Sequence, residues 1–214
     1  MKLKLYHYWR SSSSWRVRWA LAIKKITCEF VVIDLLSGEV EGPEHRKRNP
    51  LGYVPVFEVQ LGGHSSPVYL GESLAMIEWL EEVQPEPRLL PGDALTRAKI
   101  RQLAEVINAG TQPLQNINAQ DQHTQDPAEK KLWTQFWIQN GLQAYETLVQ
   151  SSAGRFSVGD SITLADLCLI PQVYNAKRYD LSLAPYPILQ RIYDAALATV
   201  ECQASAPERF DPKL

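Results

Sequence analysis

The chain has 214 residues, of which 45% are hydrophobic and 21% are charged, and its formal net charge is -2. These values are typical of a globular protein with enough apolar residues for one large core or two small ones. The near-neutral charge argues against a general nucleic-acid or membrane-surface binder, and no apolar stretch approaches the roughly 18 residues of a membrane span. We therefore expect a cytoplasmic protein that binds neither nucleic acids nor membranes.

The cysteines and histidines are few and scattered along the chain. Cys28, Cys168 and Cys202 form no C-x-x-C pair, and the four histidines lack the i, i+4 spacing of a metal-binding helix. An odd number of widely spaced cysteines also gives no indication of a disulfide framework. The sequence therefore predicts neither a disulfide scaffold nor a metal site.

The first half of the chain alternates between strand and helix patterns. A strand at residues 2–8, a helix after four serines and a strand at residues 29–34 span about 30 residues, which is long enough for the two strands to pair in parallel. A loop with a basic cluster at residues 45–48 follows, which is either a solvated face or a ligand-facing group. Residues 53–59 and 68–70 are the predicted arms of a hairpin, with Pro55 at the start of the first arm. A helix then opens at Glu72-Ser73.

The junction between the first strand and the first helix has the most informative local pattern. Ser11 to Ser14 can cap the free amides of the helix, and these amides and the helix dipole favour an anion just outside the first turn. A serine run can also serve for capping alone. Arg10, Arg16 and Arg18 crowd the same segment, and half-buried guanidinium groups need partners. We therefore expect a negatively charged ligand at this junction.

A proline-rich linker at residues 85–91 divides the chain, and helical patterns dominate after it. We place the domain boundary near residue 87. One helix is predicted from about residue 94 to residue 112, and a second begins at Asp126-Pro127, where an acceptor and a proline mark a helix start. A third begins at Thr163, where Thr163 and Asp166 form a capping pattern, and a last helix follows Pro187.

Several motifs in this arrangement resemble those of a known family. ESLAMIEWLEE at residues 72–82 and ITLAD at residues 162–166 are similar to sequences shared across the cytosolic glutathione transferases. RSSSSWRVRWAL at residues 10–21, NPLGYVP at 49–55, QPLQN at 112–116 and PQVYNAKR at 171–178 resemble the zeta class in particular. The resemblance implies a thioredoxin-like α/β domain at residues 1–87, an all-α domain at residues 88–214, glutathione as the cofactor and a homodimer.

The resemblance also implies roles for individual residues. Ser11 and Ser12 match the catalytic serines beside the glutathione sulfur, and the Ser11 hydroxyl is the expected donor to the thiolate. Arg10 and Arg178 are the expected partners of substrate carboxylates, with a surface or interdomain ion pair as the alternative for each. The other positions that match glutathione-binding residues are Ser13, Val54, Pro55 as a cis proline, Glu72, Ser73, Gln112 and Asn116.

The implied activity is the glutathione-dependent cis-to-trans isomerisation of maleylacetoacetate in tyrosine and phenylalanine breakdown. Ser13 departs from the class pattern, which usually has cysteine there, and this disfavours dehalogenation through a mixed disulfide. The alternatives are isomerisation of maleylpyruvate, conversion of α-haloacids, and a non-catalytic scaffold with the same fold. The presence of the serine run, Val54-Pro55, Glu72-Ser73 and Arg178 together favours an enzyme.

Overall fold

The computed structural model describes residues 1–35, 37–63 and 66–213. The chain divides into two compact units, of which the first contains Met1–Arg88 and the C-terminal segment from Val200 onward, and the second contains Leu89–Thr199. The sequence-based boundary assigned the C-terminal segment to the second domain, whereas this segment packs with the first unit. No helix in the described part of the chain is long and apolar enough to cross a membrane.

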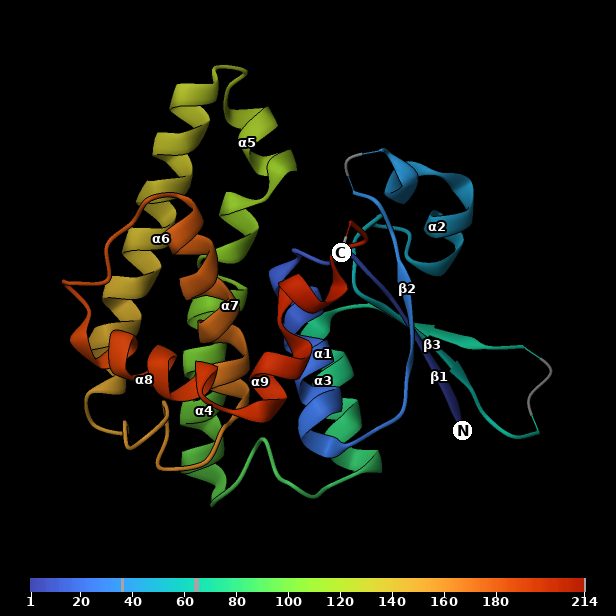
Figure 1. Ribbon diagram of the computed structural model, residues 1–214, viewed down its shortest axis with the longest axis horizontal. Coiled ribbons are helices and arrows are strands. Elements are labelled where there is room, and N and C mark those ends of the chain that lie inside the picture. Colours follow the sequence, from blue (N-terminus) through green and yellow to red (C-terminus); the bar gives the residue numbers. More distant parts are fainter. Residues whose placement is uncertain (36, 64–65, 214) are drawn as a thin grey trace. The chain divides into compact units, whose positions relative to one another are not determined.

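The first unit is built on a mixed sheet with the strand order β2-β1-β3-β4 (Figure 1). Its strands are β1 (Lys2–His7), β2 (Glu29–Val32), β3 (Val56–Gln60) and β4 (Val68–Leu70). β1 pairs in parallel with β2, as predicted, and antiparallel with β3. The helices α1 (Ser12–Lys24) and α3 (Ser73–Val83) pack against each other on one face of the sheet, and α2 (Pro43–Arg48) lies on the other side.

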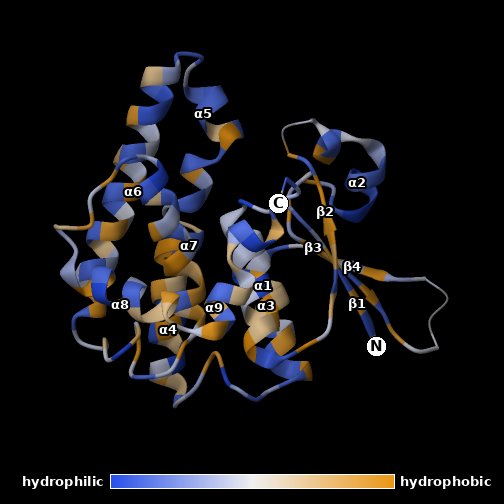
Figure 2. Ribbon diagram, viewed as in Figure 1, coloured by the Kyte–Doolittle hydropathy of each residue, from blue (hydrophilic) through white to orange (hydrophobic). Residues whose placement is uncertain are grey.

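Successive residues of β1 serve the two faces of this sheet, because side chains alternate along a strand. Leu5 is fully buried and lies opposite Phe57 of β3, which is buried too. Tyr6 belongs to a smaller cluster with Ile33 and Val56. Figure 2 shows hydrophobic residues concentrated in the strands of this sheet. The central strands β1 and β3 are therefore largely buried, whereas the edge strands β2 and β4 are mostly exposed.

The end of the chain completes the first unit. The helix α9 (Val200–Ser205) packs against α1, and the short 3-10 helix η3 (Pro207–Phe210) follows it. Trp15 Nε1 donates to Ser205 Oγ, and Arg18 Nε donates to the Ser205 carbonyl, both at 3.1 Å. Trp15 and Arg18 are almost completely buried. One side of α1 is thus covered by residues from the far end of the sequence.

The second unit is helical, as predicted. Its helices are α4 (Ala94–Asn108), η2 (Gln112–Gln115), α5 (Ile117–His123), α6 (Pro127–Val149), α7 (Leu164–Arg178) and α8 (Pro187–Leu197). Asp126 caps α6 by accepting from the Ala128 and Glu129 amides at 2.7 and 3.1 Å. Asp166 of α7 accepts from the Thr163 amide at 2.8 Å and from the Thr163 hydroxyl at 2.9 Å. The predicted capping role of Thr163 and Asp166 is therefore confirmed.

Several boundaries differ from the sequence-based expectations. Residues 43–48 form α2, where the sequence indicated a loop, and β3 begins at Val56 rather than at residue 53. α4 ends at Asn108 rather than near residue 112, because the Gly110 amide turns back to the Glu105 carbonyl at 3.2 Å. The predicted turns between residues 62 and 67 include residues 64 and 65, which lie outside the described residues.

Candidate functional site

The serine run forms the N-terminus of α1 in the first unit. Ser11 is the N-cap, and its Oγ accepts from the Ser14 amide at 3.2 Å. Because this oxygen acts as an acceptor, the hydroxyl proton can be donated to another group. Ser12 and Ser13 are half-buried. The first turn of α1, all of which is described, contains no acidic residue, so no carboxylate within that turn offsets the positive end of the helix dipole.

A second helix N-terminus lies at the start of α3, the helix that packs against α1. Glu72 precedes this helix with φ 62° and ψ 110°, a backbone conformation that is unusual for a residue with a side chain. Such conformations are concentrated at functional sites. Ser73 is buried, and its Oγ accepts from Arg16 Nη1 at 3.2 Å. The fully buried Arg16 therefore links α1 to the start of α3 and adds positive charge there.

The segment before β3 contains the Val54-Pro55 peptide bond, which is cis as predicted. The carbonyl of the preceding Tyr53 accepts from Asn49 Nδ2 at 3.1 Å and lies 3.0 Å from His45 Nε2. Because a carbonyl oxygen only accepts, His45 donates through Nε2. His45 and Asn49 are buried. These two side chains, whose contribution the sequence analysis did not identify, hold the backbone that leads into Val54.

Arg10 lies on the wall of a cavity of about 570 Å³ in the first unit. Its other charged lining residues are Lys213 and the acidic Asp34, Glu39 and Asp211. Arg10 Nη2 donates to the Tyr8 hydroxyl at 3.3 Å, and the guanidinium carbon is 5.0 Å from the centre of the Trp9 ring. Its Nε has no hydrogen-bond partner among the described residues. Within the part of the chain that the structure describes, Arg10 is thus one of two cations at a cavity that three carboxylates also line.

Arg18 fixes the loop that carries Arg10 and Ser11. Its Nη2 donates to the Trp9 carbonyl at 2.9 Å, and its Nη1 lies 3.1 Å from Nδ1 of the buried His7. The guanidinium carbon is 4.6 Å from the centre of the Phe210 ring. Burial lowers the pKa of Arg18 to about 9, against the opposing effect of Glu208, so the group stays charged at neutral pH. The two buried arginines therefore fix the backbone and side chains of the site: Arg16 bonds to Ser73, and Arg18 bonds to the Trp9 carbonyl.

The tyrosines near the serine run have other partners. Tyr6 donates its hydroxyl to Glu58 Oε2 at 2.7 Å, and the Arg48 guanidinium carbon lies 4.3 Å from the centre of the Tyr6 ring. Burial, together with the bond to Glu58, raises the pKa of Tyr6 to about 12. The Tyr8 hydroxyl accepts from Arg10. The Tyr6 proton is therefore committed to Glu58, whereas the Tyr8 oxygen, like that of Ser11, accepts a bond and keeps its own proton to donate.

The remaining sequence-predicted site residues lie in the second unit. Gln112 is the first residue of η2 and is half-buried, and Asn116 follows the last residue of η2 and is exposed. Arg178 is the last residue of α7, is exposed, and donates through Nη1 to Asn175 Oδ1 at 3.1 Å. Gln115, between Gln112 and Asn116, is buried and hydrogen-bonded to α7. The sequence analysis gave Gln115 no role.

Within the first unit, the geometry suits an extended ligand with separate anionic groups. Ser11 and the first turn of α1 offer a hydroxyl donor and a positive dipole end, which lower the pKa of a nearby thiol. Ser73, backed by Arg16, offers the same combination for a carboxylate at α3. A thiol peptide with a free carboxylate therefore fits the residues that are present.

Comparisons with known proteins agree with this reading of the site. Residues 5–88 match a model of the glutathione S-transferase N-terminal domain, and residues 111–200 match a model of the C-terminal domain. The chain is 46% identical, over 88% of its length and 74% of the relative's, to a probable maleylacetoacetate isomerase 1 of Drosophila melanogaster. A crystal structure of maleylacetoacetate isomerase from Anaeromyxobacter dehalogenans with bound GSH is 48% identical, with a TM-score of 0.90 over 99% of this chain and 97% of that one. A maleyl pyruvate isomerase, described as a zeta-class bacterial glutathione-s-transferase, is 35% identical with a TM-score of 0.90, covering 98% of each chain.

Proposed function

Because this chain belongs to the glutathione S-transferase family and to its zeta class, which includes maleylacetoacetate isomerases, we propose that it isomerises maleylacetoacetate to fumarylacetoacetate with glutathione as cofactor. The observation that carries the proposal is the N-terminus of α1, where Ser11 keeps a hydroxyl proton to donate and no acidic residue lies in the described first turn. The proposal includes the homodimer and the cytoplasmic location that the class resemblance implies.

Each residue of the proposed glutathione site has its own role. When bound, glutathione supplies a thiolate that adds reversibly to a conjugated double bond. Ser11 donates to that sulfur, and the α1 dipole favours its anionic form. Ser73 and the α3 N-terminus hold a carboxylate of the cofactor, while the backbone at Val54 and the half-buried Ser12 and Ser13 line its path. We propose Gln112 and Asn116 as further cofactor contacts.

The substrate carries carboxylates, which require cationic partners. Arg10 supports this role because its side chain lines a cavity of the first unit. Arg178 is the second proposed partner, and its exposed guanidinium is bonded to a neutral amide. A positive charge near the substrate also stabilises the negative charge that builds up on the carbonyl oxygen during addition.

Maleylpyruvate is the alternative substrate, since a maleyl pyruvate isomerase shares the fold over 98% of the chain. The family resemblance associates that activity with histidine and arginine near the stretch equivalent to residues 112–118, and QPLQNIN contains neither. The sequence of this stretch therefore favours maleylacetoacetate.

The test is turnover of maleylacetoacetate with and without glutathione, for the unchanged protein and for Ser11→Ala. We expect turnover that requires glutathione and a fall in kcat/KM of at least about tenfold in the variant, which corresponds to about 1.4 kcal/mol of barrier, because the thiolate loses its donor.

The matched control is Ser182→Ala. Ser182 is an exposed serine whose Oγ accepts from the Ala184 amide at 3.1 Å, so its loss removes a similar local bond away from the serine run. Its kcat/KM should equal that of the unchanged protein. Turnover that is independent of glutathione would reject the proposed function, and a Ser11→Ala variant with full activity would reject the role of the hydroxyl.

A further inference from the structure

The two motifs QPLQN and PQVYNAKR, which lie far apart in the sequence, meet through side-chain amides in the second unit. Gln115 Nε2 donates to Gln172 Oε1 at 2.6 Å, and Gln172 Nε2 donates back to Gln115 Oε1 at 3.1 Å. Asn175 Nδ2 donates to the same Gln115 Oε1 at 2.9 Å, and Asn175 Oδ1 accepts from Arg178. We call Gln115, Gln172 and Asn175 the amide relay.

The relay becomes more exposed toward the arginine. Gln172 is fully buried, Gln115 is 6% exposed, Asn175 is half-buried and Arg178 is exposed. Gln120 Nε2 donates to the Gln115 carbonyl at 2.7 Å and so fixes the backbone at the inner end. The hydrogen bonds therefore run from the buried amides of Gln172 and Gln115 to the exposed side chain of Arg178.

The chemistry of the groups fixes the direction of every bond. A guanidinium can only donate, so Asn175 must present its oxygen to Arg178. The Asn175 nitrogen then needs an acceptor, which is Gln115 Oε1, and the Gln115 nitrogen needs one in turn, which is Gln172 Oε1. Reversing any of these amides would bring donor against donor or leave a buried amide unpaired, which costs free energy. The relay therefore specifies one orientation of the Asn175 carboxamide.

The acceptor that holds Arg178 is neutral. No ion pair joins Arg178 to a carboxylate within residues 1–35, 37–63 and 66–213, whereas Asp180, two residues beyond the end of α7, pairs with Lys131 at 2.7 Å. A carboxylate partner would hold the guanidinium and cancel its charge. A carboxamide holds it and leaves the full charge for an anion. Ordering an arginine in advance also reduces the rotamer entropy that binding would otherwise cost.

We infer that Gln115, Gln172 and Asn175 are positioning residues that orient Arg178 toward a substrate carboxylate without neutralising it. The inference rests on the proposed function, because it takes Arg178 as a partner of the substrate. It also explains why two family-specific motifs, one in η2 and one in α7, occur together: their amides form one relay.

The test is a double-mutant cycle of Gln115→Met and Arg178→Ala, with Asn108→Ala as the matched control. Asn108 is a half-buried amide on α4 that bonds to Glu105 instead of to the relay. We expect Gln115→Met to raise KM about fivefold with kcat within about twofold, because binding of the carboxylate weakens in the ground and transition states alike. In the Arg178→Ala background the same substitution should change KM by less than about twofold. Asn108→Ala should leave KM unchanged.

A second readout separates this inference from the proposed reaction. Binding of malonate, a simple dicarboxylate, is measured by calorimetry with glutathione present for the same variants, and the same pattern is expected. If the unchanged protein does not turn over maleylacetoacetate, the proposed function fails and the malonate arm alone decides the inference. An equal effect of Gln115→Met in both backgrounds, no effect in either, or no malonate binding by the unchanged protein would overturn it.

Asn175→Asp tests the requirement for a neutral acceptor. Aspartate can still accept from Arg178 but cannot donate to Gln115, and it places a negative charge beside the guanidinium. We expect KM for the diacid and Kd for malonate to rise by about fivefold or more. Unchanged values in this variant would contradict the inference, since they would show that the charge of the acceptor has no influence.

Discussion

At the scale of single residues, the surroundings of His7 lower the pKa of its imidazole. His7 is completely buried at the end of β1, between the rings of Phe30 and Phe210, whose centroids lie 5.7 and 5.3 Å away. Arg18 donates to its Nδ1, so the neutral imidazole carries its proton on Nε2. Burial, and next the charge of Arg18, lower the pKa of His7 to about 3.

This pKa predicts an acid-sensitive stability. The unfolded chain takes up a proton at its histidine near pH 6.5, whereas the folded protein does so near pH 3, so acid favours unfolding within that window. Above pH 6.5 the imidazole is neutral in both states, and the protein keeps its full stability. As the pH falls below 6.5, the uptake of a proton by the unfolded chain should lower the free energy of unfolding by at most about 1.4 kcal/mol per pH unit. Denaturation between pH 7 and pH 4 would measure the slope.

His7→Gln keeps an acceptor for Arg18 and cannot take up a proton. Its free energy of unfolding should fall less steeply below pH 6.5 than that of the unchanged protein. His123→Gln, which removes an exposed histidine that stacks on Trp133, serves as the control and should keep the original slope. Parallel curves for the unchanged protein and His7→Gln would show that His7 is not the source of the acid sensitivity.

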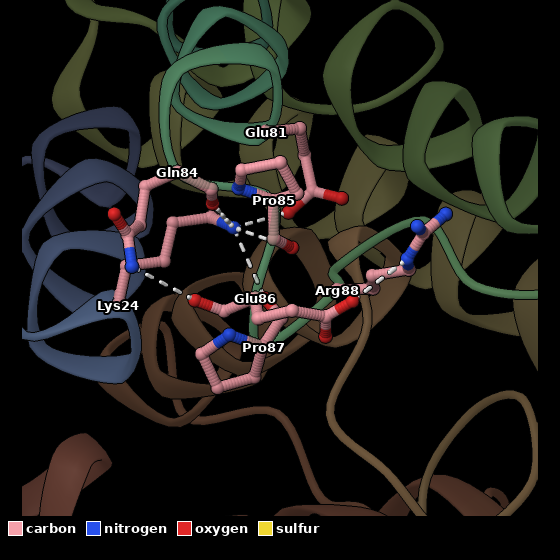
Figure 3. A network of polar contacts seen from close by, with 7 residues as sticks. All are labelled: Lys24, Glu81, Gln84, Pro85, Glu86, Pro87 and Arg88. Atoms are coloured by element: carbon pink, nitrogen blue, oxygen red, sulfur yellow. Dashed lines mark hydrogen bonds and ion pairs between the residues drawn. The ribbon is translucent and has the colours of Figure 1, made fainter.

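At the scale of elements, a single lysine joins the ends of two helices in the first unit. Lys24, in the last turn of α1, has a fully buried side chain whose Nζ lies 2.5 Å from Glu81 Oε1 of α3. The same nitrogen donates to the carbonyls of Gln84 at 2.7 Å and Pro87 at 3.0 Å (Figure 3). Lys24 therefore satisfies the end of α3 and fixes the start of the proline-rich segment.

Lys24→Met should destabilise the protein by about 3 kcal/mol, because it leaves the Glu81 carboxylate and the carbonyls without their donor in a buried place. Chemical denaturation at neutral pH would measure the change. Lys47→Met is the matched control: Lys47 also pairs with a glutamate, Glu44, at 2.7 Å, but both side chains are about 70% exposed (70% and 72%). Its unfolding midpoint should stay unchanged. Equal unfolding midpoints for both variants would show that burial of the lysine does not increase its contribution to stability.

Helix starts were predictable from the sequence because their signals are local. Asp126-Pro127 and Thr163 with Asp166 each satisfy amides within three residues, so the pattern is complete in a short window. α2 begins with Pro43 but has no side-chain cap, and its residues are mostly charged and lack an apolar period. Of the site, the cis Val54-Pro55 bond and the capping by Ser11 were predicted and are present. The roles of these residues toward glutathione stay predictions.

What the sequence could not indicate depends on long-range pairs. Gln115 and Gln172 are ordinary amides in ordinary helical stretches, and only the fold brings them to 2.6 Å. Ser205 likewise has no local signal, because its partners Trp15 and Arg18 lie near the opposite end of the chain. Periodicity and capping describe short windows, so contacts between distant windows require the structure.

At the scale of the whole molecule, the first unit is discontinuous in sequence. Its final elements, α9 and η3, supply the Ser205 carbonyl to Arg18 and the Phe210 ring that Arg18 covers. Since Arg18 in turn holds the Trp9 carbonyl, the C-terminal segment supports the loop that carries Arg10 and Ser11.

A chain that ends at Thr199 should therefore be less stable and should bind glutathione more weakly, because Trp15 and Arg18 lose buried partners. We expect a loss of about 3 kcal/mol or more in the free energy of unfolding, measured by denaturation, with glutathione binding followed by calorimetry. Removing only residues 211–214 keeps α9 and η3 and should preserve the unfolding midpoint. If the longer truncation behaved like the shorter one, α9 and η3 would be dispensable for the first unit.

The discontinuity also sets an order of assembly during translation. The ribosome releases β1, α1 and the serine run first, yet the residues that cover α1 are among the last to be made. The second unit is one uninterrupted stretch, so all of its residues are synthesised before the first unit has its full set. Until α9 and η3 have been synthesised, the loop that carries Arg10 and Ser11 therefore lacks the contacts that Ser205 and Phe210 make with Arg18.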